Sequence, residues 1–199
     1  FQRRGIPDID YVLTSSEIIT MLQEIGIRFD RLEPEAYDMP FSIYSGAGVI
    51  FGATGGVTEA AVRRVVEDKS PKALKDIEFI GLRGMEGVKI SELPYQGRTL
   101  RIAVVSGLGN ADRLLQKIES GEEHFDFVEV MACAGGCVAG AGQPFARSTE
   151  KRLRAEGLYK TDKALQIKRS EENPLVETLY NDLLKNREHA LLHVKYGKK

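Results

Sequence analysis

The chain has 199 residues, which is enough for one substantial hydrophobic core. Hydrophobic residues make up 42% of it and charged residues 29%, as in globular proteins. The 28 basic residues are balanced by 29 acidic ones, and no apolar run approaches the roughly 20 residues of a membrane span. This composition favours a cytoplasmic protein with no nucleic-acid partner and no membrane partner.

The first residues carry positive charge but no apolar segment follows them, so they do not resemble a signal peptide. They also lack an initiator Met, and we expect a processed subunit or a fragment of a longer gene product. Residues 9–14 predict a strand. Thr14 and Glu17 then form a capping-box pattern before a helix that ends at Gly26. The apolar face of this helix would hold Ile18, Ile19, Leu22 and Ile25.

A glycine-rich segment at residues 45–56 precedes a second predicted helix, in which apolar residues repeat at helical spacing from Val57 onwards. Such a segment raises the possibility of a nucleotide-binding loop. The pattern does not fit, because Phe51 stands where a third glycine is required and no Lys-Ser or Lys-Thr pair follows. A second short glycine loop fails in the same way, with Asp112 at the third position.

The clearest prediction is a β-α-β unit. Residues 99–107 predict a buried strand, Asn110 could cap the following helix, and residues 125–131 predict a second strand parallel to the first. Cys133 and Cys137 would then emerge at the carboxyl end of a strand, which is the edge where open α/β sheets bind ligands.

The remainder of the chain is polar and helical in pattern. Asn173 followed by Pro174 predicts a helix start. We expect an α/β fold with a small, mostly parallel or mixed sheet flanked by helices, divided into an α/β lobe at residues 1–147 and a helical extension at residues 148–199 that packs on it. The apolar stripe of that extension would hold Val176, Leu179, Tyr180, Leu183 and Leu184.

The two cysteines are separated by four positions, with Gly135 and Gly136 between them. A structural zinc site usually needs further ligands, whereas a disulfide is geometrically possible but nothing indicates an oxidising compartment. Two buried thiols without chemistry are another reading. The surrounding glycines favour a fourth interpretation, that the loop binds an anion or a sulfide-rich cluster. A loop without side chains lets backbone N–H groups approach such a group closely.

The pattern ExMACxxGCxxGxGQP at residues 129–144 resembles a signature of iron-only hydrogenases. So do SGAGVIFGATGGVTEAA and, towards the C-terminus, LYKTDKALQIKRSEENPLVETLY and HALLHVKYGKK. The resemblance implies an H-cluster, a four-iron four-sulfur cubane joined by a cysteine sulfur to a di-iron unit. Cys133 would ligate the cubane, and Cys137 would bridge to the di-iron unit. Met131 and Phe51 would pack beside that unit, with the backbone of Gly52 near its diatomic ligands.

Other polar residues have simpler interpretations. Glu129 is expected to hold backbone donors rather than to transfer protons. His189 and His193 stand four residues apart and could mimic a metal-binding pair, but without a third ligand we favour packing on a helix face. His124 lies apart from them. Ala141 occupies a position where the resembled family usually has glycine, which would perturb the loop modestly.

The resembled family requires two further cluster cysteines, from TSCCP-type and MPC-type motifs, which this sequence does not contain. We therefore expect the C-terminal half of a hydrogenase catalytic domain. Its partners would be the N-terminal half and an electron carrier such as ferredoxin. Alone it should be inactive, with the H-cluster absent or incomplete and its exposed face either disordered or covered by a second copy in a homodimer. The alternatives are an iron-sulfur assembly or scaffold protein, a sensory homologue, and a cluster-free module.

Overall fold

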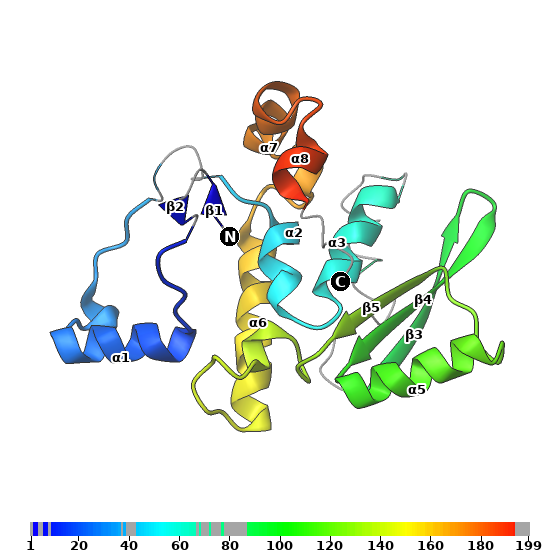
Figure 1. Cartoon of the computed structure of the whole chain (residues 1–199), viewed down its shortest axis with the longest axis horizontal. Helices are drawn as coiled ribbons and strands as arrows, with labels where there is room; N and C mark the ends of the chain where they lie inside the picture. Colours follow the sequence, from blue (N-terminus) through cyan, green and yellow to red (C-terminus); the bar gives the residue numbers. More distant parts are fainter. Residues whose placement is uncertain are drawn as a thin grey trace.

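A three-stranded mixed sheet with the strand order β3-β4-β5 forms one side of the molecule (Figure 1). Strands β3 and β4 are antiparallel, whereas β4 and β5 are parallel. This arrangement confirms the predicted α/β class. The strands are β3 (Val88–Tyr95), β4 (Arg98–Ser106) and β5 (Phe127–Met131). The computed structural model describes residues 2–3, 6–7, 9–36, 38, 43–66, 68, 72, 77 and 87–193.

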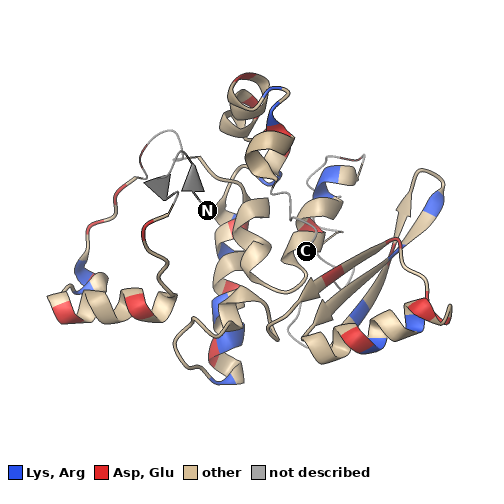
Figure 2. Ribbon diagram, viewed as in Figure 1, with Lys and Arg blue, Asp and Glu red and all other residues tan. Residues whose placement is uncertain are grey.

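Helices pack on both faces of this sheet, and the other helices lie farther away on one side of it (Figure 1). A small antiparallel pair, β1 and β2, lies near the N-terminus. Charges of both signs are scattered over α5 and α6, whereas the charged residues of α1 are acidic (Figure 2). The remaining elements are β1 (Gln2–Arg3), β2 (Ile6–Pro7), α1 (Ser15–Ile25), η1 (Phe29–Arg31), α2 (Gly46–Val49), η2 (Ile50–Gly52), α3 (Gly56–Val65), α5 (Leu108–Glu119), η3 (Cys137–Ala139), α6 (Ser148–Ala164), η4 (Ser170–Glu172), α7 (Pro174–Thr178), η5 (Leu179–Leu183) and α8 (Glu188–Leu192).

Strand β4 forms the core because it is buried on both faces. Val104 packs in one apolar cluster with Val62 of α3, whereas Ala103 and Val105 pack in a second cluster with Leu114 of α5. Successive side chains of a strand point to opposite faces, so one run of apolar residues serves both layers. The continuous apolar sequence of this strand is thus explained by helices on either side of it.

The predicted β-α-β unit is confirmed, with one correction at the start of its helix. Helix α5 begins at Leu108, and its N-cap is Gly107 with a φ of 90° rather than Asn110. Asn110 lies inside the first turn, where its side-chain Nδ2 donates to the backbone oxygen of Ser106 at 2.7 Å. The positive φ of Gly107 turns the chain sharply enough for the helix to begin earlier than the sequence indicated.

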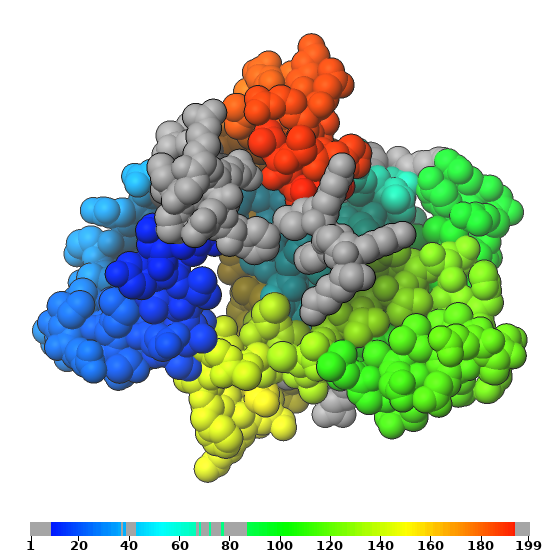
Figure 3. Space-filling model, viewed as in Figure 1, coloured from blue at the N-terminus to red at the C-terminus, as the bar shows by residue number. Residues whose placement is uncertain are grey.

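Helix α1 has the predicted boundaries. The Thr14 backbone N–H donates to Glu17 at 2.7 Å, the Glu17 N–H donates to the Thr14 hydroxyl at 3.3 Å, and Gly26 ends the helix with a φ of 81°. The backbone and side-chain hydrogen bonds from Thr14 lower the pKa of Glu17. None of the residues of α1 is buried, and the helix stands at the opposite edge of the molecule from the sheet (Figures 1 and 3).

The predicted strand at residues 9–14 is wrong. This segment forms an extended arm without strand pairing, and the side chains of Tyr11 and Val12 are 85% and 84% exposed. Alternating apolar residues form a strand only when a neighbouring strand accepts their backbone hydrogen bonds. The described part of the chain supplies no such neighbour to this arm.

A buried ionic cluster joins α3 to α6. The Arg63 guanidinium donates to Glu59 at 2.6 Å and to both carboxylate oxygens of Asp162 at 2.8 and 2.7 Å, and all three residues are at most 2% exposed. Burial alone would lower the pKa of Arg63, but the hydrogen bonds to Asp162 and the charge of Glu59 raise it. Arg169 adds a bond of 3.0 Å from its Nε to the Arg63 carbonyl.

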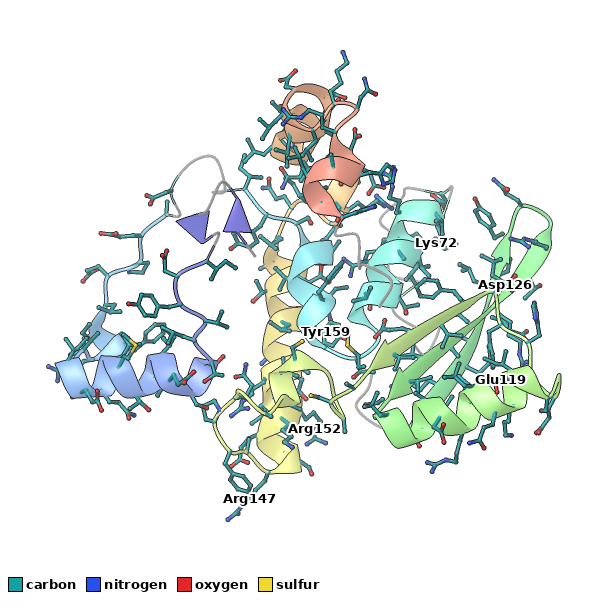
Figure 4. The ribbon with its side chains drawn as sticks, in the orientation of Figure 1. Lys72, Glu119, Asp126, Arg147, Arg152 and Tyr159 are labelled. Carbon is teal, nitrogen blue, oxygen red and sulfur yellow. The ribbon has the colours of Figure 1, made fainter. Side chains whose placement is uncertain are left out.

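Helix α6 also lies against α2, and Figure 4 places Tyr159 on the part of α6 beside α2 and Arg147 at its opposite end. Beyond α6, helix α7 begins at Pro174 with Asn173 as its cap, as predicted. The apolar stripe expected there is only partly covered, since Leu184 is 4% exposed but Leu183 is 62% exposed. A π-helical turn at η5 shifts these side chains out of a single helical register.

Candidate functional site

The two cysteines lie in a loop that leaves the carboxyl end of β5, as the sequence predicted. Both thiols are free and exposed. Gly135 and Gly136 between them have φ values of 94° and 84°, a conformation that side chains rarely adopt. The glycines therefore let the chain fold back tightly, so that the thiols stand on either side of a short turn.

Two neighbouring loops hold this turn in place. The Gly135 N–H donates to the Ser106 hydroxyl at 2.9 Å, and the Gly107 N–H donates to the Met131 carbonyl at 2.8 Å. On the other side, the Thr54 N–H donates to the Gly135 carbonyl at 3.3 Å. The cysteine loop is thus fastened both to the end of β4 and to the glycine-rich segment before α3.

The closest approach in this region is between backbones. A Cβ atom on Gly136 would lie 2.8 Å from the Thr54 nitrogen and 2.9 Å from the Gly52 oxygen. Real Cβ atoms do not come so near to backbone atoms, so this position requires glycine for space as well as for conformation. Gly52 is thereby placed directly behind the cysteine loop.

Glu129 anchors the glycine-rich segment to the strand that carries the cysteine loop. It is 6% exposed, and its carboxylate accepts hydrogen bonds from the Gly55 N–H at 2.7 Å, the Thr58 N–H at 2.7 Å and the Thr58 hydroxyl at 2.6 Å. Gly55 is the N-cap of α3 and has no side chain, so Glu129 performs the capping from another element. The predicted role of Glu129 as a holder of backbone donors is confirmed.

An open concavity of about 410 Å³ lies in front of the loop. It brings together three residues singled out in the sequence, Met131, Cys133 and Cys137. Phe51 and Gly52 do not line it, and the Phe51 side chain is 46% exposed. Ala141 is also exposed. The full lining is Leu13, Thr14, Ser15, Met131, Ala132, Cys133, Gly136, Cys137, Gly140, Gly142 and Gln143.

The N-terminal arm forms one wall of this concavity, which the sequence did not indicate. The Ser16 N–H donates to the Gly142 carbonyl at 3.0 Å, and the Gln143 amide donates to the Ser15 hydroxyl at 2.9 Å. The capping-box pattern predicted the start of α1, but it carries no information about contacts with the cysteine loop, which lies 126 positions away at Gly142. Only the assembled fold shows that this helix start borders the cysteines.

The histidines have a different arrangement from the one expected. His189 and His193 are both exposed, with their Nδ1 atoms 2.9 Å apart. The preferred reading, packing on a helix face, is therefore wrong, because both histidines are exposed. His124 is exposed beyond α5, where its carbonyl accepts from Arg101. No group of three or more metal-binding side chains occurs among the described residues.

Comparison with known families identifies the family of this chain. Residues 1–141 match a family model described as "Iron only hydrogenase large subunit, C-terminal domain". The chain belongs to the iron-only hydrogenase family. Residues 148–199 match a second model, "Iron hydrogenase small subunit". The two matches leave between them the segment that leads from the cysteine loop into α6.

Curated relatives of this iron-only hydrogenase chain include proteins of two kinds. The "NADP-reducing hydrogenase subunit HndD" of Solidesulfovibrio fructosivorans is 40% identical over 100% of this chain and 35% of its own length. The "Iron hydrogenase 1" of Clostridium pasteurianum is 37% identical over 99% of this chain and 36% of its own length. The "Cytosolic iron-sulfur assembly component 3" of Rattus norvegicus is 30% identical over 95% of this chain and 41% of its own length.

Solved structures of the family share the fold of this chain. An apo FeFe-hydrogenase HydA1 from Chlamydomonas reinhardtii superimposes with a TM-score of 0.69 at 32% identity, over 94% of this chain and 55% of that one. The chain thus spans about a third of the length of the first curated relatives and about half of the solved structure. In the described part, no helix is long and apolar enough to cross a membrane.

Proposed function

We propose that this chain forms one side of an H-cluster site, in a protein that interconverts protons and electrons with dihydrogen. Cys133 would ligate the cubane, and Cys137 would provide the sulfur that joins the cubane to the di-iron unit. Thiolates are the usual ligands of iron-sulfur clusters. When bound, the cluster would supply the redox chemistry.

The observation that carries the proposal is the position of the two thiols. They stand exposed at an open concavity of about 410 Å³, behind which glycines and Glu129 fix the backbone. This donor set fits half of the cubane, because two thiolates are present where four are needed. The remaining two would come from a preceding part of the polypeptide, which covers the concavity and completes the domain. The division into an α/β lobe (1–147) and a helical extension (148–199) remains part of this proposal.

The other residues would shape the surroundings of the cluster. Met131 lines the concavity and would present an apolar, polarizable side chain to the di-iron unit. Gly52 would offer backbone atoms from behind the loop, since its carbonyl already lies against Gly136. Phe51 does not line the concavity, so it would reach the di-iron unit only if its exposed side chain turned toward the concavity. An electron carrier such as ferredoxin would exchange electrons with the complete protein.

Iron-sulfur assembly is the second candidate function. It is favoured by the assembly components, which are about 30% identical to this chain over nearly its whole length. A protein of that class would use the same cysteine loop to hold a cubane without a di-iron unit. The two candidates therefore differ in what the loop holds, rather than in whether it binds iron and sulfide.

The test joins the chain to the part of Iron hydrogenase 1 of Clostridium pasteurianum that the match to this chain does not cover. The fusion is matured without oxygen and assayed for hydrogen evolution with a reduced viologen dye. Cys137→Ala should abolish hydrogen evolution, whereas Ser120→Ala, at the far end of α5, should not alter it.

Iron content and electron paramagnetic resonance separate the two candidates. A fusion that holds four iron atoms and four sulfides but evolves no hydrogen after loading with a synthetic di-iron complex would favour assembly. A fusion in which Cys133→Ala and Cys137→Ala keep the full iron and sulfide content would refute both candidates, because the loop would then not ligate a cluster.

A further inference from the structure

The exposed histidine pair at the end of α8 lies outside the site described above. Figure 1 shows α8 next to α7, on a part of the molecule remote from α5. The two Nδ1 atoms of His189 and His193 lie 2.9 Å apart, and their ring centroids lie 4.6 Å apart with an interplanar angle of 70°. Because the nitrogens are closer together than the ring centroids, the Nδ1 edges of the two rings face each other.

The ring positions fit two nitrogens that converge on one point. A metal ion held at about 2.05 Å from each nitrogen, with a right angle between the two bonds, would place the nitrogens about 2.9 Å and the ring centroids about 4.5 Å apart. A tetrahedral angle would require about 3.3 Å between the nitrogens. A straight hydrogen bond between the same atoms would separate the centroids by about 5.2 Å. The observed 2.9 and 4.6 Å agree best with the right angle.

We propose that His189 and His193 form a bidentate site for a divalent transition-metal ion that prefers right-angled coordination, with Cu²⁺ as the ion of highest affinity. Imidazole nitrogens suit such ions, and Cu²⁺ binds N/O sites more tightly than the other first-row divalent ions. Both Nδ1 lone pairs would point to the metal, so each neutral ring keeps its proton on Nε2. Water would fill the remaining positions, because both side chains are exposed.

This site does not depend on the proposed H-cluster function, because neither histidine lines the concavity at the cysteine loop. Cu²⁺ would also oxidise or bind the free thiols of Cys133 and Cys137, so these are first alkylated with iodoacetamide. The untagged chain is then titrated with Cu²⁺ and followed by calorimetry and electron paramagnetic resonance. We expect one ion per chain, with hyperfine splitting from two equatorial nitrogens.

Three substitutions make the test specific. His189→Ala and His193→Ala should each weaken Cu²⁺ binding by about tenfold or more, because one ligand of a chelating pair is lost. The double variant should bind little worse than either single variant. His124→Ala is the matched control, since this exposed histidine lies elsewhere and its removal should leave the affinity unchanged.

The proposal is overturned if either single substitution at the pair leaves the affinity as it was, if His124→Ala weakens binding as much, or if the spectrum shows a single equatorial nitrogen. His189→Gln and His193→Gln repeat the measurement with longer polar side chains, and circular dichroism of every variant shows whether the fold is retained. A loss of binding in folded variants of the pair, and only there, supports the site.

Discussion

Replacing Glu129 by Ala would remove the carboxylate that caps α3 from β5. The lost interactions are the three hydrogen bonds to the Gly55 N–H, the Thr58 N–H and the Thr58 hydroxyl, all between 2.6 and 2.7 Å long. Hydrogen bonds to a charged group contribute about 1.5–3 kcal/mol each, and buried donors left without a partner cost about 1–3 kcal/mol. These terms overlap, so we expect the free energy of unfolding to fall by about 3–5 kcal/mol.

Urea denaturation followed by circular dichroism measures this loss, with Glu92→Ala as the control. Glu92 is an exposed carboxylate on β3 of the same sheet, and its removal should leave the midpoint unchanged. Glu129→Gln keeps one acceptor oxygen but turns an NH₂ group toward the donors, and its loss should lie between those of Glu129→Ala and the wild type.

A thermodynamic cycle with Thr58→Ala isolates the side-chain contact between the two elements. The double variant Glu129→Ala/Thr58→Ala should lose less than the sum of the two single losses, since both single substitutions break the same 2.6 Å bond. Additive losses, or a Glu129→Ala variant within about 1 kcal/mol of the wild type, would refute the idea that this carboxylate holds α3 to the cysteine strand.

Three further expectations concern other parts of the structure. Arg63→Met should lower the free energy of unfolding by about 3–5 kcal/mol, because it leaves two buried carboxylates without their cation. Arg64→Met is the control: its side chain is 65% exposed, so the urea midpoint should not change. Equal midpoints for the two variants would contradict this expectation. Gly136→Ala should destabilise the chain more than Gly26→Ala. Both glycines have a positive φ, but of the two only Gly136 would bring a Cβ within 3 Å of backbone atoms. Equal melting temperatures for the two variants would contradict this steric argument. Both Cys133 and Cys137 should react with a thiol reagent in the folded chain, and light scattering should show association through the concavity; a monomer with unreactive thiols would mean that the site is closed within this chain.

The parts of the fold that were predicted correctly depend on signals close together in the sequence. The Thr14 and Glu17 capping box, the apolar run of β4 and the Asn173 cap before Pro174 each determine a backbone conformation within a few residues. The position of the cysteine loop also followed, because parallel strands joined by one helix end at the same edge.

The errors arise where a distant partner decides the outcome. Residues 9–14 have strand-forming residues, but no described strand lies beside them. They form an extended arm instead, and Leu13 and Thr14 at its end line the concavity. The histidine pair was expected to be covered by a neighbouring element, and α8 leaves it exposed. Helical spacing shows which residues share a face, but only packing shows whether that face is buried.

The contacts that build the concavity have an implication for how the chain folds. Ser16 bonds to a residue 126 positions away, and Glu129 bonds to residues 74 and 71 positions away. Each of these contacts closes a long loop of chain, which costs entropy before any stabilisation is gained. Folding should therefore leave the region around the cysteines until last, after the β3-β4 hairpin and α5 have formed locally. During that interval the thiols belong to a site that has not yet formed, and the cluster proposed above could bind only after both distant segments have closed around them.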